Sequence, residues 1–464
     1  MKNINLKKLS RNEFTRYIII LMASIVTIYL LISLYFVNHT FFRTSINGVD
    51  ISLKAHDEIV GIIVSSIKDY KLQLIERDGE TEEIISQDIG MGYNEKNKIS
   101  KIFKIKNPLK WISSLIWEQK YYVDDLFFYS KEAMENKINE LNCLNKDIIE
   151  PQNVSFKYSD GLYEVIKEIY GNKVHKVSLD RALERSILEG KTKLDLNENL
   201  CYENPKYTLS SDKTLKTKDI LNKYISTKIT YIFGSMSETL DKNIINQWLS
   251  VDEDLEVEIN LKAIKKYMED LSNKYDTVGK ARKIRTSTGK IIEVRGGFYG
   301  WRINRAAEII ALYENIKRGE VISKEPEYIQ KALFREPDDI GNTYVEINIT
   351  RQHLWFYKHG KLIAQGPVVT GKPSKENATD TGIYMLNYKQ KGTILTGENY
   401  ASEVTYWMPF NGNIGIHDAS WRHSFGGDIF KRNGSHGCVN ASLYLAKKIF
   451  ENIEEGTPII CYAE

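Results

Sequence analysis

The sequence predicts a multidomain protein with one transmembrane helix, two α+β repeat domains and a mostly-β C-terminal domain. Three observations lead to this prediction. An apolar run without a charge fills residues 17–37, a residue pattern recurs in 179–207 and 303–328, and strand-like alternation dominates the last part of the chain. At 464 residues the chain is too long for one core. We expect a cytoplasmic tail at 1–16, a transmembrane helix at 17–37, repeat domains at 49–207 and 208–328, and a C-terminal domain at 341–464.

The apolar run is long enough, as a helix, to cross the hydrocarbon core of a bilayer. A single acid, Glu13, precedes it among the basic residues Lys2, Lys7, Lys8, Arg11 and Arg16. This asymmetry predicts a cytoplasmic N-terminus and an extracellular remainder. A cleaved signal peptide is the alternative, but the run is long for that role and no small-x-small site follows it in residues 37–42. We therefore expect an uncleaved anchor.

Charge and cysteine content exclude other classes. The chain has 64 basic and 61 acidic residues, so no large basic field indicates a nucleic-acid partner. Its cysteines, Cys143, Cys201, Cys438 and Cys461, are too scattered for a disulfide framework and form no CxxC pair for zinc. A bridge between Cys143 and Cys201 stays open, and Cys461 is expected in a buried strand.

The repeat in the middle of the chain is a helix stopped by a glycine and followed by a strand-like segment. The first copy has Leu179-Asp-Arg-Ala182, Gly190 and Pro205-Lys-Tyr207, and the second has Ile303-Asn-Arg-Ala306, Gly319 and Pro326-Glu-Tyr328. The N-terminal halves also agree in kind, because alternating stretches at 70–75 and 255–261 precede amphipathic helices such as 264–271. The charged, proline-containing segment 321–339 is the expected hinge before the C-terminal domain.

In the C-terminal domain, Val345, Ile347 and Ile349 alternate with polar residues, and Lys358-His-Gly360 predicts a turn into the next strand. A β-sandwich-like core is expected. One helix follows Asn440, which we expect as its cap, and Gly456 lies just past its end; its apolar positions are Leu443, Ala446, Ile449, Phe450 and Ile453.

A thiol nucleophile with its base is predicted in Ser435-His436-Gly437-Cys438-Val439-Asn440, with His417 upstream in Ile414-Gly-Ile-His-Asp418. Two glycines, two histidines, a hydroxyl and an amide converge on one thiol, and Gly437 allows a bound group to approach the backbone. We expect Cys438 at a helix N-terminus, which lowers a thiol pKa from about 8.5 and offers donors to an oxyanion. Such a site suits attack on an amide carbonyl.

Two histidines are candidates for the base. His436 lies two residues before Cys438 on an extended segment and would point to the same side, whereas His417 is a sequence-distant partner of the kind common in cysteine enzymes. Asp418 could orient the base through its carboxylate or its carbonyl. A zinc site built from His417, His423, His436 and Cys438 is a rival, although the spacings follow no zinc pattern.

His417, the intervening residues 418–434 and the Ser-His-Gly-Cys-Val-Asn run resemble the signature of the YkuD-type L,D-transpeptidases, which cross-link peptidoglycan. Residues 344–357 resemble the family's opening hairpin, and 367–371 with 379–384 resemble its second conserved block. Asp380 departs from the family's usual proline. The repeats resemble peptidoglycan-binding domains, chiefly through Gly297-Phe-Tyr-Gly-Trp301, whereas the first copy lacks the aromatic pair. A pure spacer explains the repeats equally well.

The resemblance implies that Cys438 is the nucleophile, His417 the base and the Asp418 carbonyl its orienting group, with the backbones of His436, Gly437 and Cys438 at the oxyanion. Substrate contacts are expected from Tyr400, Ser435, Asp418 and Asn440. The partners would be a donor tetrapeptide stem and an acceptor stem of peptidoglycan, a carbapenem as covalent inhibitor, and the membrane. No cofactor, metal or nucleic acid is expected. An L,D-carboxypeptidase or endopeptidase, or a non-catalytic cell-wall-binding protein, is the alternative.

Overall fold

The computed structural model describes residues 11–95, 99, 106–335, 338–397 and 400–464. The chain divides into two compact units, one of Met1–Ser155 with Val165–Ser211 and one of Phe156–Glu164 with Asp212–Glu464. The second repeat and the C-terminal domain therefore belong to the same unit. Lys2, Lys7 and Lys8 of the expected cytoplasmic tail lie outside the described residues.

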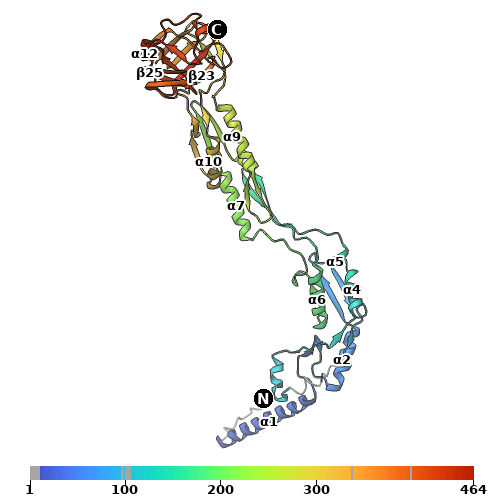
Figure 1. Ribbon diagram of the computed structural model, residues 1–464. Helices are drawn as coiled ribbons and strands as arrows, with labels where there is room; N and C mark the ends of the chain where they lie inside the picture. Colours follow the sequence, from blue (N-terminus) through green and yellow to red (C-terminus); the bar gives the residue numbers. More distant parts are fainter. Residues whose placement is uncertain (1–10, 96–98, 100–105, 336–337, 398–399) are drawn as a thin grey trace. The chain divides into compact units, whose positions relative to one another are not determined.

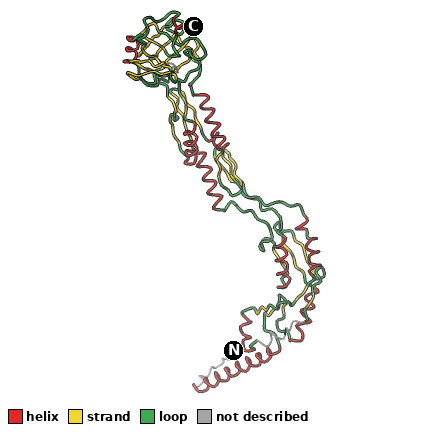
Figure 2. The backbone as a smooth tube through the Cα atoms, in the orientation of Figure 1, coloured by secondary structure: helices red, strands yellow, loops and turns green. Residues whose placement is uncertain are grey.

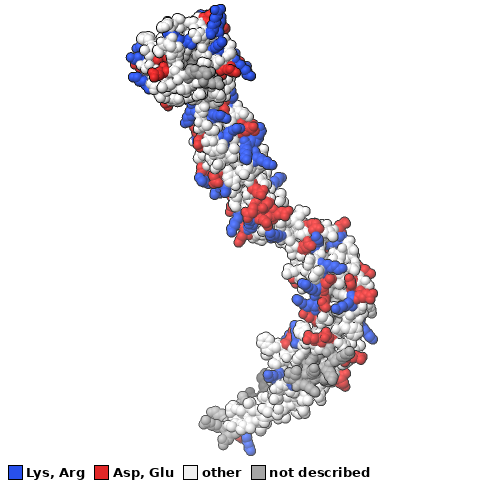
Figure 3. Space-filling model, viewed as in Figure 1, with Lys and Arg blue, Asp and Glu red and all other residues white. Residues whose placement is uncertain are grey.

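The first unit begins with the long helix α1 (Arg11–Asn38). Within the described residues, Glu13–Asn38 is the one helix that is long and apolar enough to cross a membrane. Its surface is largely free of charge in Figure 3, whereas acidic and basic side chains are interspersed over the face shown of the remaining chain. Beside α1 lie a small sheet and a 3-10 helix: β1 (Thr44–Ile46), β2 (Val49–Asp50), β6 (Gln119–Tyr121) and η1 (Pro108–Leu115).

The first repeat packs helices against a sheet of order β10-β3-β4, in which β10 runs parallel to β3. Alternate residues such as Leu72 and Leu74 are fully buried against Leu183 and Ile187 of a helix. The elements are α2 (His56–Lys68), β3 (Lys71–Ile75), β4 (Thr81–Ile85), β5 (Gly92–Tyr93), β7 (Phe127–Phe128), α4 (Lys131–Asn139), α5 (Asn142–Asn145), α6 (Lys176–Leu188) and β10 (Lys193–Asp195).

The second repeat has the same order, with the last strand parallel to the first: β12-β11-β18. Its elements are α7 (Asp212–Ile225), β11 (Lys228–Phe233), β12 (Met236–Leu240), α8 (Lys242–Ile245), η2 (Asn246–Trp248), β13 (Leu249–Val251), β14 (Val257–Ile259), α9 (Leu261–Tyr275), α10 (Arg305–Arg318) and β18 (Val321–Lys324). The shared topology confirms two α+β repeats. The expectation that 70–75 and 255–261 are equivalent strands of the two repeats is wrong. The strand equivalent to β3 is β11, and β14, which lies in 255–261, pairs with β13.

Each repeat also carries a hairpin between its middle and last helices. In the first repeat this is β8 (Ser155–Ser159) with β9 (Leu162–Ile166), and in the second it is β15 (Arg282–Arg285) with β16 (Ile291–Val294). Residues 156–164 of the first hairpin belong to the second unit, where Tyr163 is buried in the core of the second repeat. The second repeat is completed by the short pair β17 (Arg302–Ile303) and β19 (Tyr328–Gln330).

The C-terminal domain is a sandwich of two sheets (Figures 1 and 2). The sheet orders are β22-β21-β20-β28-β23 and β24-β25-β26-β27. Phe356 and Ile459 of one sheet meet Met408 and Ile416 of the other in a fully buried core, which confirms the strand-rich sandwich. The elements are β20 (Tyr344–Asn348), β21 (His353–Lys358), β22 (Lys361–Pro367), β23 (Gly382–Met385), β24 (Gln390–Gly397), β25 (Tyr400–Asn411), β26 (Ile414–Asp418), α11 (Ile429–Asn433), β27 (Val439–Ala441), α12 (Leu443–Asn452) and β28 (Pro458–Tyr462).

Two local expectations have different outcomes. The turn between β21 and β22 forms as expected, with φ of 52° at His359 and 75° at Gly360, the left-handed pair of a two-residue hairpin. The expected cap of α12 is wrong. Ser442, not Asn440, is the N-cap and accepts a hydrogen bond from the Leu445 N–H, while Asn440 lies in β27.

The segment expected as a hinge is attached to the second repeat wherever it is described. Strands β18 and β19 occupy part of it, and Asp339 forms a buried ion pair with Arg282 at 2.6 Å. The Tyr299 hydroxyl donates to the Asp339 carbonyl. The expectation of a hinge over 321–339 is therefore wrong for the described residues.

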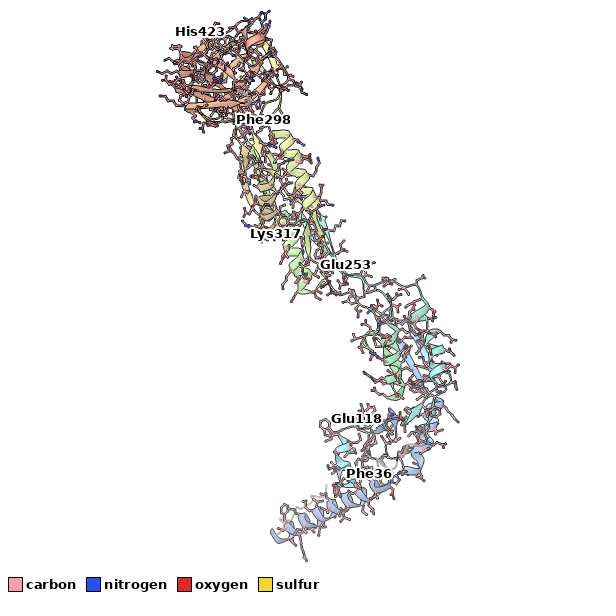
Figure 4. The ribbon with its side chains drawn as sticks, in the orientation of Figure 1. Phe36, Glu118, Glu253, Phe298, Lys317 and His423 are labelled. Carbon is pink, nitrogen blue, oxygen red and sulfur yellow. The ribbon has the colours of Figure 1, made fainter. Side chains whose placement is uncertain are left out.

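The second repeat also extends the first sheet of the C-terminal domain. Ile383 in the edge strand β23 donates its N–H to the Gly296 carbonyl at 3.1 Å and accepts from the Tyr299 N–H at 3.0 Å. Only glycine fits between these bonds, since a Cβ on Gly297 would lie 2.1 Å from the Ile383 oxygen. Phe298, labelled in Figure 4, packs its ring edge-on against Tyr384.

Candidate active site

The second sheet brings the predicted nucleophile and base to one place. Strands β26 and β27 are parallel neighbours in which His417 pairs with Asn440, and Cys438 directly precedes β27. Residues 419–438 form the connection between these strands. Cys438 is half-buried, and its thiol donates to the Asn413 carbonyl at 3.6 Å, at the turn between β25 and β26.

His417 is almost completely buried, and both of its ring nitrogens have partners. Nδ1 lies 2.8 Å from the Asp418 carbonyl, and Nε2 lies 2.9 Å from Nδ2 of Asn440. A carbonyl can only accept, so Nδ1 carries the proton and Nε2 is the basic nitrogen. Burial lowers the pKa of His417 below its ordinary value, which keeps the imidazole neutral at pH 7. The neutral imidazole of His417 therefore has its basic nitrogen at Nε2.

Arg422 determines which way the Asn440 amide points. Its Nε donates to Asn440 Oδ1 at 2.9 Å, and its Nη1 donates to the Asn433 carbonyl at 2.8 Å. Because a guanidinium has donors only, the amide must turn its Nδ2 toward His417. Sequence reasoning missed Arg422, since a single arginine in a connecting loop carries no signal of its own.

Two indole rings lie close to the imidazole of His417. The ring centroids of Trp407 and Trp421 are each 5.9 Å from that of His417. Trp407 is buried, whereas Trp421 is 47% exposed and lines the cavity. The two rings restrict how the imidazole can rotate and reduce its contact with water.

The thiol is not activated in the way that was expected. Burial raises the pKa of Cys438 to about 11, and the Gly415 backbone N–H lowers it only in part. The expectation of a lowered pKa is wrong because β27 and the cap Ser442 separate Cys438 from the start of α12. The structure thus holds a neutral thiol and a neutral imidazole.

Side-chain and backbone bonds fix the loop that ends at Cys438. The Ser435 hydroxyl accepts from the Gly437 N–H at 3.2 Å and donates to the Cys438 carbonyl. Gly437 has a φ of 114°, and a Cβ there would lie 2.9 Å from the Ile414 side chain. The expected contribution of the Gly437 N–H to an oxyanion site stays a prediction, and in this structure Ser435 accepts from that N–H.

Thr379, in the connection between β22 and β23, holds the same loop. Its hydroxyl donates to the Gly437 carbonyl at 2.6 Å and accepts from the Gly371 N–H at 2.9 Å. Thr379 lies in the block that resembled the family, but sequence reasoning assigned it no role. Its contact with Gly437 joins residues far apart in sequence and has no local signal.

A cavity of about 520 Å³ opens at this site. Of the predicted residues it gathers Cys438, His417, His436, Ser435 and Asn440. His436 is exposed there, whereas His417 is buried. Further walls come from β24, β25 and the loop with Trp421: Tyr388, Gln390, 393–396, Ser402, Trp407, Gly412, Asn413, Arg422, Asn433 and Gly434.

Asp418, one of the predicted substrate contacts, does not line the cavity. The Asp418 carboxylate is buried and accepts from the Thr405 and Tyr406 N–H groups at 2.9 and 2.7 Å, so its expected substrate contact is wrong. Tyr400 begins β25, but its side chain lies outside the described residues.

The zinc alternative does not match this geometry. Both ring nitrogens of His417 are bonded to protein groups. In the part of the chain that is described, the group of acidic, histidine or cysteine residues close enough to share an ion is Glu76, Asp78 and Glu80. Lys146 already occupies that cluster, with its ammonium 2.5 Å from Glu76 and 2.8 Å from Asp78.

Two family profiles match this chain. The profile described as the L,D-transpeptidase catalytic domain (YkuD) matches residues 342–461. A second profile, described as "Putative peptidoglycan binding domain", matches residues 83–195 and 209–322, one match in each repeat. A comparison with curated proteins returned no match.

Sequences of solved L,D-transpeptidase structures also match this chain. A cysteine-to-serine mutant of the Enterococcus faecium L,D-transpeptidase is 30% identical, over 54% of this chain and 100% of that one, with a TM-score of 0.45. The Ldtfm-avibactam carbamoyl enzyme is also 30% identical, over 54% and 98%, with a TM-score of 0.45. The catalytic domain of the E. faecium enzyme acylated by ertapenem is 38% identical, over 26% and 97%, with a TM-score of 0.25. By its sequence matches the chain belongs to the L,D-transpeptidase family.

Proposed function

We propose that this protein is a membrane-anchored L,D-transpeptidase that forms 3-3 cross-links in peptidoglycan by acyl transfer through Cys438. The observation that carries the proposal is that Cys438 and His417 line the same cavity, with the Asp418 carbonyl fixing Nε2 as the basic nitrogen of a neutral imidazole. A thiol, a neutral base and a cavity with polar walls are the parts that cysteine acyl transfer needs.

The donor half of the reaction begins with a tetrapeptide stem in the cavity. As the Cys438 sulfur attacks the carbonyl carbon of the third residue, a diamino acid, the thiol proton passes to His417 Nε2. The oxyanion formed is stabilised by donors in the cavity, and we assign this role to the Cys438 N–H because Ser435 holds that of Gly437. Collapse of the intermediate breaks the bond to the terminal D-alanine, whose amine takes the proton from His417, and leaves a thioester.

The acceptor half resolves this thioester. The side-chain amine of the third residue in a second stem attacks the thioester carbonyl and gives its proton to His417. The thiolate of Cys438 leaves as the C–S bond breaks and takes the proton from the imidazolium. The product joins the third residues of two stems, and the enzyme returns to its neutral pair.

The resting geometry requires one rearrangement before this chemistry. Nε2 accepts from Asn440, so the Cys438 proton reaches the base only when that hydrogen bond lengthens or the thiol rotates from Asn413. With a thiol pKa of about 11, about one Cys438 in ten thousand is ionised at pH 7. Proton transfer is therefore coupled to attack on a bound substrate rather than completed beforehand.

The first unit and the repeats support the proposed location. Helix α1 would cross the membrane once with its N-terminus in the cytoplasm, and the repeats would carry the catalytic domain outside, facing the cell wall. The repeats would bind peptidoglycan or act as a spacer. In the second repeat Tyr299 is fully buried and Trp301 donates its indole N–H to the Phe334 carbonyl at 2.9 Å, whereas Phe298 is 63% exposed. Phe298 is thus the most exposed aromatic of this motif, although one edge of the residue packs against Tyr384.

A product assay tests the proposal. The full-length protein in detergent is incubated with disaccharide-tetrapeptides, and the products are separated and analysed by mass. Dimers linked between third residues, with free D-alanine, are the expected products, and Cys438→Ala is the inactive control. Tripeptides without dimers would mean that water is the acceptor and that the protein is a carboxypeptidase. The same chemistry predicts that a carbapenem acylates Cys438 with one-to-one stoichiometry.

A further inference from the structure

The 3-10 helix η1 and the two residues after it expose a continuous apolar surface. Leu109, Ile112, Leu115, Ile116 and Trp117 are 49%, 49%, 51%, 67% and 69% exposed. We call these five side chains the η1 face. Lys110 is the sole charged residue in the run 108–117. Large apolar side chains gathered in this way on an extracytoplasmic domain indicate an interaction surface.

The opposite side of η1 packs against the C-terminal part of α1. The Trp111 ring stacks on Phe36 with centroids 5.9 Å apart and meets Tyr29 at 5.9 Å. The Tyr29 hydroxyl donates to the Leu109 carbonyl. Phe36, labelled in Figure 4, is only 1% exposed, whereas its neighbour Leu34 is 68% exposed. One side of the C-terminal part of α1 is thus covered by η1, whereas Leu34 on another side is exposed.

The position of this contact along α1 determines whether the η1 face meets lipid or water. Tyr29 precedes Val37, the last residue of the apolar run, by 8 residues, or roughly 12 Å at the helical rise. One leaflet of the hydrocarbon core is about 15 Å thick. If α1 spans a bilayer, the contact with η1 at Tyr29 lies within the outer leaflet rather than in water.

The backbone and flanks of η1 suit that environment. Its N–H groups find partners locally, since Lys110 donates to the Asn107 carbonyl at 3.0 Å and Trp117 to the Ser113 carbonyl at 2.9 Å. Internally bonded backbone is a requirement in hydrocarbon. Charged groups follow at once, with Glu118 bonded to Lys120 at 2.9 Å and to Arg43 at 3.4 Å. Trp117 lies between the apolar and charged parts, the position that tryptophan favours at membrane interfaces.

We propose that the η1 face is seated in the outer leaflet of the bilayer beside α1 and contacts lipid acyl chains. The protein is then held by a spanning helix and by a second, interfacial element, which together orient the first unit on the membrane. This inference rests on the proposed role of α1 as an uncleaved anchor. The contact between Tyr29 and Leu109 would then fix η1 to the membrane-spanning helix. Cleavage of α1 would remove that contact.

Environment-sensitive labelling in liposomes tests the proposal. The full chain with Cys438→Ser is used, because Cys143, Cys201 and Cys461 are buried and unreactive. Single cysteines are introduced at Ile116 in the η1 face, at Leu31 in α1, and at Ile148, which is 59% exposed elsewhere in the same unit, as the matched control. Each is labelled with the fluorophore NBD and reconstituted with or without lipids that carry a doxyl quencher on the acyl chain.

We expect the labels at 31 and 116 to lose emission to the lipid quencher and the label at 148 to keep it. Quenching at 31 but not at 116 overturns the membrane seat and leaves the anchor intact. Blue-shifted emission at 116 without quenching means that protein, such as a second copy, covers the η1 face, and this also overturns it. Absence of quenching at all three positions rejects the anchor itself, and the membrane seat with it.

Discussion

His417 and Asn440 face each other across the parallel strands β26 and β27, and the imidazole Nε2 accepts a hydrogen bond from the Asn440 amide at 2.9 Å. The asparagine expected to cap a helix is therefore a partner of His417, the proposed base. Because Nδ1 is held by the Asp418 carbonyl, the imidazole has one tautomer and one orientation. The resting site is a neutral pair, and several measurements follow from that.

The reactivity of Cys438 should increase steadily with pH. Burial raises the pKa of the thiol to about 11, so the thiolate fraction grows about tenfold per pH unit between pH 7 and 10. We expect the rate of alkylation by iodoacetamide to follow this slope, measured by mass on the full-length protein. A plateau between pH 6 and 7 would instead indicate a preformed thiolate–imidazolium pair. Cys438→Ala shows the background from the buried cysteines.

Replacing the base should slow acylation far more than replacing the neighbouring histidine. His417→Gln removes the proton acceptor and is expected to lower the acylation rate by roughly two to four orders of magnitude. His436→Gln, at an exposed position on the same cavity, is the matched control and should have a smaller effect. Equal losses in the two variants, with both folded by circular dichroism, would contradict the assignment of His417.

Removing the arginine that orients Asn440 should change the titration of His417. In Arg422→Leu the Asn440 Oδ1 loses its donor, so the amide is free to turn that oxygen toward Nε2. An oxygen there favours the protonated imidazole, and the pKa of His417 should rise, as followed by NMR of the ring protons. Arg432→Leu, on the nearby helix α11, is the control. An unchanged His417 titration in Arg422→Leu would show that Arg422 does not orient the amide.

The junction between the second repeat and the catalytic domain should depend on a buried ion pair. The Arg282 and Asp339 side chains are 8% and 5% exposed, so Arg282→Met leaves a buried carboxylate without its partner. The free energy of unfolding should fall by about 3–5 kcal/mol. The exposed pair of Lys266 and Asp270 is the control, and Lys266→Met should lower the free energy of unfolding far less, because an exposed ion pair is screened by water. Similar losses in urea melts of both variants would be inconsistent with this account.

The sequence was sufficient for features that have a local pattern. The apolar run of α1, the glycine-terminated helices α6 and α10, and the turn at His359 and Gly360 each result from residues close together in the chain. The Ser-His-Gly-Cys run likewise identified the cavity, because its members are adjacent in sequence. These features rest on periodicity, caps and conformational freedom, all of which can be read without a fold.

The rest depended on contacts between distant segments. Asn440 looked like a helix cap because a helix does follow, and only the register of β26 against β27 places it at His417. Arg422 and Thr379 act through single hydrogen bonds formed by loops from different strands. The thiol pKa was misjudged for a related reason, since burial by the folded domain outweighs the effect of a helix terminus that lies beyond β27.

The central claim is that Cys438 forms a thioester with the donor stem. The most direct test is the intact mass of the full-length protein after rapid mixing with a disaccharide-tetrapeptide and acid quenching, followed by peptide mapping. The account predicts a transient mass increase equal to the stem without its terminal D-alanine, located on Cys438 and absent in Cys438→Ala. Cross-linked products formed without that adduct, or an adduct located on another residue, would contradict it.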